Sequence, residues 1–222
     1  MMKMEYLTGK SGKIINMNNF VDILGSDLSN IQTGYDFLNE EELSYILNAI
    51  KISESRFNED KLHFQPFLYL KDHERDPLIK LLMQINTKIL DFATKAYNKE
   101  FIKSERNWSI NVHRVNSFTD PHTDIIERSP GPQKPGLTEP LYPNWIDAWD
   151  GYLACNLYLN DDYDGGQVYF KDRQHIFKPK ANSIVCWPGN KNFIHGITKT
   201  TKTSRYVYGY FIKFADYDKY NQ

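Results

Sequence analysis

Residues 152–160 read Tyr-Leu-Ala-Cys-Asn-Leu-Tyr-Leu-Asn, a stretch between a glycine and an aspartate whose composition favours a β-strand. Successive side chains of a strand point to opposite faces of the sheet. One face would carry Ala154, Asn156 and Tyr158, and the other would be aliphatic. We predict that the aliphatic face packs against other elements and that the Tyr158 face lines a pocket. The aliphatic face consists of Leu153, Cys155, Leu157 and Leu159.

Further short strands are predicted around this one in the second half of the chain. Clusters of glycine, proline, asparagine and aspartate separate them, and no helical pattern intervenes. Short strands in direct succession indicate an antiparallel sandwich or barrel rather than a parallel α/β sheet. The predicted strands cover residues 109–116, 167–171, 175–178, 183–187 and 205–214.

The first part of the chain, to about residue 100, has a helical pattern instead. Asn39 precedes three glutamates, which is typical of a helix N-cap with an acidic third position. Asp76-Pro77 predicts a second helix start, because proline suits the first helical turn. Over residues 78–97 apolar side chains recur every three or four positions, as in a helix that packs against a sheet. We expect an α+β, mainly β, fold in which these helices buttress the barrel.

The composition narrows the class of protein. Of the 222 residues, 41% are hydrophobic and 25% are charged, which excludes a disordered chain. The 27 basic and 28 acidic residues nearly cancel, which argues against a nucleic-acid partner bound through a broad basic surface. Cys155 and Cys186 lie in apolar runs and are predicted to be buried thiols of a reducing compartment. No apolar run approaches the ~20 residues of a membrane span and no signal peptide is evident, so a soluble cytoplasmic protein without membrane contact is expected.

The residues with the clearest chemistry are His122, Asp124 and His195. Two positions apart on an extended segment, His122 and Asp124 point to the same side. With the distant His195 they would form the 2-His-1-carboxylate set that binds non-haem Fe(II) and leaves positions open. A His-x-Asp pair is common by itself, and its alternative interpretation is a surface pair. The residues His63, His73 and His175 lie in polar surroundings and are predicted to be surface residues.

Arg205 opens the last predicted strand, ten residues after His195. A buried arginine needs an anionic partner, and its planar guanidinium matches a carboxylate. If the aliphatic face of residues 152–160 packs outward, Tyr158 points into the same pocket as Arg205. We therefore predict that Arg205 and the Tyr158 hydroxyl share one carboxylate group of a ligand.

In this order, the motifs resemble the Fe(II)/2-oxoglutarate-dependent dioxygenase superfamily and, within it, the prolyl 4-hydroxylase-like branch. The resemblance implies a double-stranded β-helix (a cupin-like jelly roll) over about residues 108–214, with helical support over about 1–107, in a single domain of residues 1–222. The matching motifs are Pro121-His122-Thr123-Asp124, Leu157-Tyr158-Leu159-Asn160-Asp161 with Gly165-Gly166, Trp187-Pro188-Gly189, His195-Gly196-Ile197 and Arg205-Tyr206.

The resemblance also implies a role for individual residues. His122, Asp124 and His195 would be the Fe(II) ligands, and we count them as the catalytic residues because the iron carries the difficult step. The distal carboxylate of 2-oxoglutarate would bind between charged and polar side chains, with apolar side chains beside it. The implied co-substrate residues are Arg205, Tyr158, Trp187 and Ile197.

A proline-rich segment, residues 129–150, separates the His-x-Asp motif from the strand at 152–160. A loop of this length inside a compact domain is usually functional or disordered. We predict an ordered lid or substrate rim that carries Tyr142, Trp145 and Trp149. The alternative is a mobile insertion.

The activity implied by the resemblance is hydroxylation of an unactivated C–H bond, with 2-oxoglutarate and O2 consumed, succinate and CO2 released, and ascorbate in support. The favoured substrate is a prolyl residue in a protein or peptide, and a free amino acid or other small molecule is the alternative. A nucleic-acid demethylase is disfavoured by the charge balance. A non-catalytic jelly-roll binding module is the alternative from another class, against which the intact His-Asp-His set with Arg205 argues. The oligomeric state stays open.

Overall fold

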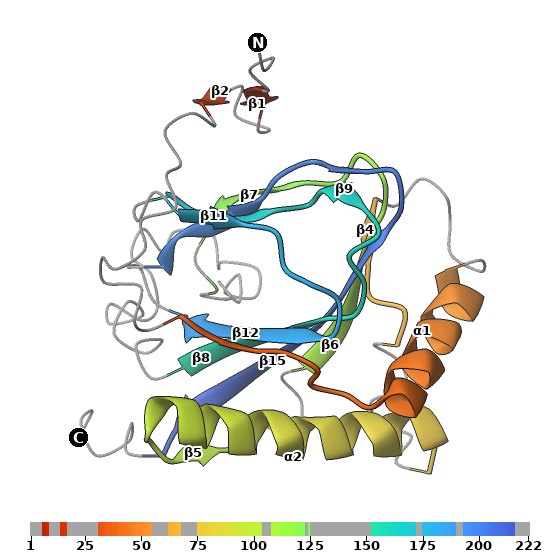
Figure 1. Cartoon of the computed structure of the whole chain (residues 1–222), viewed down its shortest axis with the longest axis vertical. Coiled ribbons are helices and arrows are strands. Elements are labelled where there is room, and N and C mark those ends of the chain that lie inside the picture. The colour runs from red at the N-terminus through yellow and green to blue at the C-terminus, as the bar shows by residue number, and fades with distance from the viewer. Residues whose placement is uncertain are drawn as a thin grey trace, which may run out of the picture.

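The computed structural model describes residues 6–8, 14–16, 31–54, 62–67, 75–103, 108–122, 124, 152–171, 175–189 and 193–215. Within these residues, two β-sheets lie opposite one another, and a long helix runs beneath the larger sheet (Figure 1). Every strand pairing is antiparallel. The predicted α+β, mainly β, double-stranded β-helix with helical support is confirmed.

The larger sheet has seven strands and provides the floor on which the site is built. Short strands from the first half of the chain extend it: one lies at each end of the strand order, and a third pairs with part of β15. Its order is β3 (Gln32–Gly34), β12 (Ser183–Pro188), β8 (Tyr152–Tyr158), β15 (Arg205–Phe214), β6 (Trp108–His113) and β4 (His63–Phe64), with β5 (Phe101–Ile102) paired to β15.

The smaller sheet has four strands and faces the larger one. Two further strand pairs are short ribbons, one of which joins the turn after β8 to the turn before β15. The smaller sheet has the order β11 (His175–Phe177), β10 (Val168–Phe170), β13 (His195–Ile197) and β7 (Thr119–His122), and the ribbons are β9 (Asp164–Gly165) with β14 (Thr200–Thr201) and β1 (Tyr6–Thr8) with β2 (Ile14–Asn16).

Both predicted helix starts are confirmed. Helix α1 (Glu40–Glu54) begins with a reciprocal capping box, in which Glu42 N donates to Asn39 Oδ1 at 2.9 Å and Asn39 N donates to Glu42 Oε2 at 3.1 Å. Helix α2 (Pro77–Tyr97) begins after Asp76, whose Oδ1 accepts from Leu78 N at 2.8 Å. The start of each helix is therefore fixed by hydrogen bonds between residues that are close together in the chain, without a tertiary contact.

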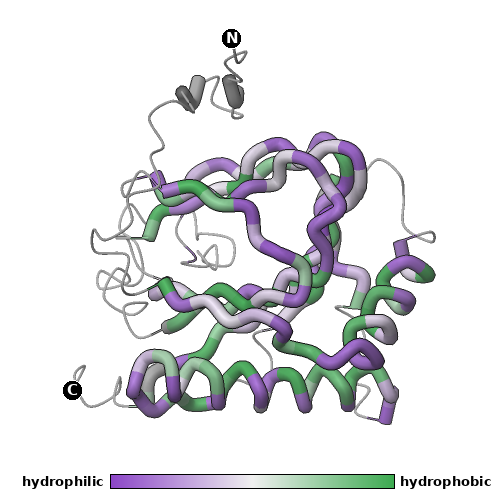
Figure 2. The backbone as a smooth tube through the Cα atoms, viewed as in Figure 1, coloured by the Kyte–Doolittle hydropathy of each residue, from purple (hydrophilic) through white to green (hydrophobic). Residues whose placement is uncertain are grey.

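The two helices cover the outer face of the larger sheet. The hydrophobic residues that recur along α2 (Figure 2) include Leu82, Ile85 and Ile89, which have no exposed surface. They pack in one cluster with Leu157 and the other aliphatic side chains of β8, as predicted. Tyr208 belongs to the same cluster, and its hydroxyl donates to Asn86 Oδ1 on α2. The helices thus keep water from one whole face of the sheet.

The inner face of the larger sheet forms a second, smaller cluster. Tyr158 and Val207 lie in it, on the face opposite Leu157, as the alternation of side chains predicts. The predicted burial of the two thiols is confirmed as well: Cys155 and Cys186 are free cysteines that face each other across β8 and β12.

The prediction that the first part of the chain is helical is wrong for five short strands, of which β1 and β2 pair with each other. Strands β3, β4 and β5 come from this part and join the larger sheet as short additions. Strands of two or three residues are too short to show an alternating pattern, so only the pairing partner reveals them. Strand β13, with three residues, and strand β7, with four, are likewise too short for the sequence pattern to predict.

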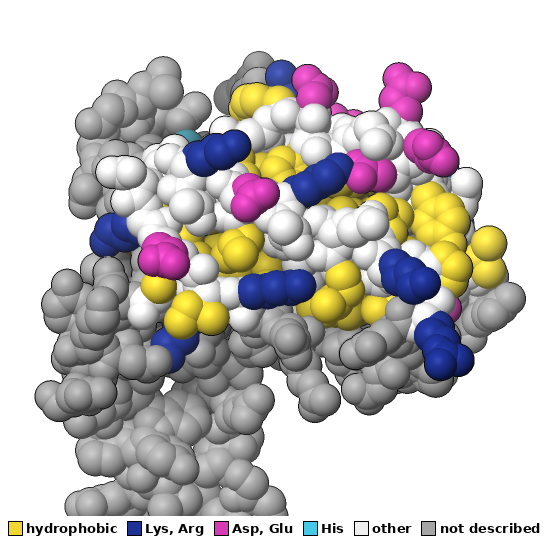
Figure 3. Space-filling model, turned by 90° about the horizontal axis from the view of Figure 1, so that it is seen from below, with side chains coloured by type: hydrophobic (Ala, Val, Ile, Leu, Met, Phe, Trp, Pro, Cys, Tyr) yellow, Lys and Arg dark blue, Asp and Glu magenta, His cyan; other side chains and the backbone are white. Residues whose placement is uncertain are grey.

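The charged side chains are mixed on the surface that is seen from below in Figure 3, on the side where α2 lies. Basic and acidic groups are interspersed there, with hydrophobic side chains between them. None of the helices in the described ranges is both long enough and apolar enough to cross a membrane.

The pairing of Glu42 with Lys88 gives a test of how α1 is held on α2. Lys88 Nζ lies 2.6 Å from Glu42 Oε1 and 2.7 Å from Oε2. Burial acts to raise the pKa of Glu42, but the hydrogen bonds from Lys88 and Asn39 outweigh it, and the pKa lies below 4.5. We expect Glu42→Gln to lower the free energy of unfolding at pH 7 by about 0.5–1 kcal/mol, because the Lys88 side chain is 42% exposed and partly screened.

The sign of the pH dependence follows from the lowered pKa. The carboxylate stabilises the fold above its unfolded pKa, and this stabilisation is lost as the pH falls through the folded pKa. Urea denaturation should therefore show a difference between wild type and Glu42→Gln that fades below pH 4.5. Glu41→Gln removes the same charge from an exposed position in the same turn and is the control. An equal loss of unfolding free energy in both variants would contradict the stabilising role given to the pairing of Glu42 with Lys88.

Candidate metal centre

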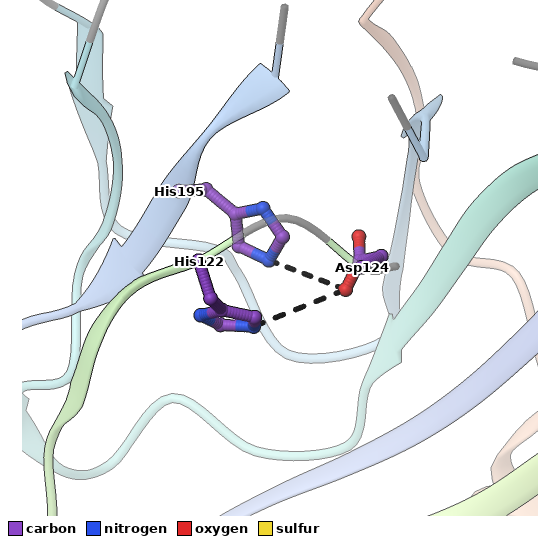
Figure 4. Close-up of side chains that lie close together, drawn as sticks. All are labelled: His122, Asp124 and His195. Atoms are coloured by element: carbon purple, nitrogen blue, oxygen red, sulfur yellow. Dashed lines mark ion pairs between the residues drawn. The ribbon is translucent and has the colours of Figure 1, made fainter. Parts of the chain in front are cut away.

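Three side chains meet at the open side of the smaller sheet. His122 is the last residue of β7, Asp124 follows it, and His195 opens β13, where it pairs directly with His122. In Figure 4 both imidazoles point toward the Asp124 carboxylate. His195 Nε2 lies 3.5 Å and His122 Nε2 lies 4.0 Å from Asp124 Oδ1. One potential ligand atom from each residue lies within 4.8 Å of the others.

Backbone carbonyls fix the orientation of both imidazoles. His122 Nδ1 lies 2.8 Å from the carbonyl oxygen of Asp120, and His195 Nδ1 lies 3.0 Å from that of Phe193. A carbonyl only accepts, so in each ring Nδ1 carries the hydrogen and Nε2 presents its lone pair toward Asp124. This tautomer is the one that a metal-ligating Nε2 requires.

Burial keeps His195 neutral. It lowers the pKa of His195 below its ordinary value, and His122 acts in the same direction, although Asp124 acts to raise it. The three residues differ in exposure, since the side chain of His122 is 42% exposed whereas that of His195 is 6% exposed. The site is therefore open to solvent on the His122 side and closed on the His195 side.

Trp187 holds the carboxylate from the opposite sheet. Its indole Nε1 donates to Asp124 Oδ2 at 2.8 Å, which leaves Oδ1 facing the two histidines. The Trp187 ring also lies edge-on to His195, with 4.9 Å between the ring centroids. Sequence reasoning placed Trp187 beside the co-substrate and missed this hydrogen bond, because no local pattern links residues so far apart in the chain.

The donor set fits a divalent iron ion. Two imidazoles and one carboxylate converge from one side, a combination that matches the 2-His-1-carboxylate triad of non-haem Fe(II) sites. The second oxygen of the carboxylate is hydrogen-bonded, as outer contacts of metal ligands usually are. The structure thus brings together all three residues predicted as ligands.

Arg205 is a buried cation. It is 2% exposed, and its Nε and Nη1 have no hydrogen-bond partner among the described residues. Its Cζ lies 5.1 Å from the centre of the Tyr158 ring, and the sharing of one ligand carboxylate by these two residues stays a prediction. Burial raises the pKa of Tyr158 and outweighs the opposing charge of Arg205, so the phenol keeps its proton. A guanidinium with two unpartnered nitrogens and a protonated phenol beside it fit a ligand carboxylate.

The other predicted residues have different outcomes. Ile197 is half-buried and pairs with Val168, whose side chain lies in the inner cluster, so its predicted place beside the co-substrate stays a prediction. The predicted rim residues Tyr142, Trp145 and Trp149 lie outside the described residues, as does the whole 129–150 segment.

The surface assignment of His175 is wrong. Its ring is half-buried and stacks on Phe170, with 6.3 Å between the centroids, and also contacts Phe177. Phe170 in turn contacts His195 and Trp187, at centroid distances of 5.7 Å and 5.3 Å. These aromatic contacts around His195 were not predicted from the sequence either, although Phe170 lies in the apolar strand β10.

Comparison with known proteins finds one family model that matches part of the chain. Residues 108–213 match the family model described as the 2OG-Fe(II) oxygenase superfamily, a range that contains all three triad residues and Arg205. Among curated proteins, none matches the chain significantly.

Solved structures of prolyl hydroxylases share the fold at low sequence identity. A collagen prolyl hydroxylase of Paramecium Bursaria Chlorella virus-1, in complex with 2-oxoglutarate, is 15% identical with a TM-score of 0.51, and the match covers 84% of this chain and 96% of that one. A prolyl 4-hydroxylase of Phytophthora capsici is 17% identical with a TM-score of 0.55, over 90% of this chain and 64% of that one. A prolyl hydroxylase of Trichoplax adhaerens, in complex with a peptide fragment of hypoxia inducible factor, is 12% identical with a TM-score of 0.56, over 93% and 92%.

The hydrogen bond from Trp187 to Asp124 predicts a measurable effect on metal affinity. Trp187→Phe removes the N–H and keeps an aromatic ring, so the carboxylate loses its anchor while the cluster stays filled. We expect Fe(II) to bind about 10- to 100-fold more weakly, measured by anaerobic competition with a chelator. Trp108→Phe changes a buried tryptophan in the outer cluster of the same sheet and should leave the affinity unchanged. Equal affinities for wild type and Trp187→Phe would contradict the role given to the indole.

Proposed function

We propose, on the premise that residues 108–213 belong to the 2OG-Fe(II) oxygenase superfamily, that this chain is an Fe(II)- and 2-oxoglutarate-dependent dioxygenase that hydroxylates an unactivated C–H bond. The observation that carries the proposal is the combination of an open His-Asp-His face with a buried arginine whose Nε and Nη1 have no acceptor among the described residues. A non-catalytic jelly-roll module that had lost the metal would have no need for the two features together, because buried polar groups cost stability unless a ligand compensates them.

The roles of the residues follow from their positions. Fe(II) held by His122, Asp124 and His195 would supply the oxidation that couples decarboxylation of 2-oxoglutarate, to succinate and CO2, to C–H hydroxylation. Arg205 and Tyr158 would bind the far carboxylate of 2-oxoglutarate and so orient its keto-acid end toward the metal. No side chain is required as an acid or base for this assignment.

The inner cluster would provide a dry wall. Val185 and Val207 are 1% and 3% exposed, and Phe170 is fully buried beside His195. Apolar side chains around a reactive metal exclude water and protect the oxidant from side reactions. The half-exposed His122 marks the side from which a substrate would approach.

For the substrate we propose a prolyl residue in a protein or peptide. The proposal is supported by fold neighbours that are prolyl hydroxylases, one of them solved with a bound peptide. A free amino acid or another small molecule is the competing substrate class. Ascorbate, which would return iron to the Fe(II) state, belongs to the same proposal.

A spectroscopic experiment tests the cofactor assignment. Mixing the protein anaerobically with Fe(II) and 2-oxoglutarate should give the visible metal-to-ligand charge-transfer band of a chelated keto acid. His122→Ala should abolish the band, because it removes a ligand. His175→Phe keeps an aromatic ring at a histidine that is no ligand, and it should retain the band. A wild-type protein without the band would refute the proposed function, and a band that survives in His122→Ala would refute the ligand set.

A turnover experiment tests the substrate class. Succinate formation should rise above the uncoupled background with proline-containing peptides, and not with the same peptides carrying alanine at the proline position. Free amino acids are assayed in parallel, as members of the competing substrate class. If the peptides are inert while a free amino acid stimulates succinate release, the prolyl proposal is wrong and the dioxygenase proposal stands.

A further inference from the structure

A second buried phenol lies beside Arg205. Tyr163, in the turn between β8 and β9, has no exposed surface, and its hydroxyl has no hydrogen-bond partner among the described residues. Burial raises the pKa of Tyr163 and outweighs the opposing effect of Arg205, whose guanidinium is close enough to act on the phenol through its charge and as a hydrogen-bond donor. The phenol therefore keeps its proton and is available as a donor.

Gly166 shows that Tyr163 and Arg205 pack around one point. A Cβ atom at Gly166 would lie 2.7 Å from Tyr163 Cε2 and 3.2 Å from Arg205 Cδ. Gly166 also has a φ of +60°, which other residues adopt reluctantly. The second glycine of the Gly-Gly turn thus leaves the space that the Tyr163 ring and the Arg205 side chain occupy.

Lys178 fixes the tyrosine from the other side. Its Nζ donates to the carbonyl oxygen of Tyr163 at 2.6 Å and lies 4.9 Å from the centre of the Tyr163 ring. A ring held by both a glycine turn and an ammonium group is preorganised. Its hydroxyl nevertheless makes no hydrogen bond to any described residue.

The unsatisfied atoms at this place can all donate a hydrogen bond. Arg205 Nε and Nη1 are donors only, and the Tyr163 hydroxyl retains its hydrogen. Buried donors without acceptors are rare in proteins because each one costs free energy. The acceptor that satisfies several converging donors around a cation is a carboxylate.

We propose that Tyr163 is a third hydrogen-bond donor to the distal carboxylate of the co-substrate, together with Arg205 and Tyr158. The inference rests on the proposed function, because that function supplies the 2-oxo dicarboxylic acid. It makes Tyr163 a specificity-determining residue: Tyr163 favours keto acids with a second carboxylate over those without one.

The experiment compares two keto acids on the Fe(II)-loaded protein under anaerobic conditions. The charge-transfer band is titrated with 2-oxoglutarate and with pyruvate, which has the same keto-acid end and no distal carboxylate. In Tyr163→Phe we expect the apparent Kd for 2-oxoglutarate to rise about tenfold, with the Kd for pyruvate unchanged. Fe(II) affinity should be the same in wild type and variant.

Thermal unfolding separates ligand binding from a structural role. Without 2-oxoglutarate, Tyr163→Phe should unfold at the wild-type temperature or above it, because the lost hydroxyl had no partner. With saturating 2-oxoglutarate, its gain in Tm should be smaller than that of wild type. The control Tyr208→Phe removes a buried hydroxyl that is hydrogen-bonded to Asn86 on the outer face. It should lower Tm and leave both Kd values unchanged.

The failures of the two proposals are distinguishable. An unchanged Kd for 2-oxoglutarate in Tyr163→Phe, or an equal loss for both keto acids, would overturn the role of Tyr163 while the proposed function stands. A wild-type protein that gives no band with either keto acid would overturn the proposed function itself.

Discussion

The antiparallel pairing of β13 with β7 sets His195 directly opposite His122, and the rest of the site is arranged around this pair. Backbone carbonyls then turn both Nε2 atoms toward Asp124. The carboxylate is held from the opposite sheet, because Trp187 on β12 donates to its free oxygen. The geometry of the site therefore depends on the spacing between the two sheets. A change in the packing across the barrel would also change the site.

That spacing depends on the different roles of the two faces of the larger sheet, because one face packs against helices and the other lines the site. The outer face is closed by α1 and α2, whose aliphatic side chains share a cluster with Leu157 and Tyr208. The inner face can then carry Tyr158, Trp187 and Arg205 without having to supply most of the burial. A sheet packed on one side by helices can keep polar groups on the other, because the packed side provides the hydrophobic stabilisation.

The buried donors around Arg205 show where the fold gives up stability. A guanidinium that is 2% exposed, with Nε and Nη1 unpartnered, and a fully buried Tyr163 hydroxyl are arrangements that a structural core would avoid. Sites that bind ligands collect such groups, since the ligand satisfies them. The Gly166 turn and Lys178 keep Tyr163 in place, so the donors are positioned before an anion arrives.

The sequence by itself determined the features that depend on near neighbours along the chain. The caps at Asn39 and Asp76, the two faces of β8, and the His-x-Asp spacing all follow from local geometry, and each is confirmed. Only the tertiary structure decided the short strands β3, β4 and β5, the hydrogen bond from Trp187 to Asp124, the half-buried place of His175 and the meeting of Tyr163 with Arg205. The reason is physical: periodicity and capping act over a few residues, whereas which distant side chains touch is set by strand register and sheet spacing.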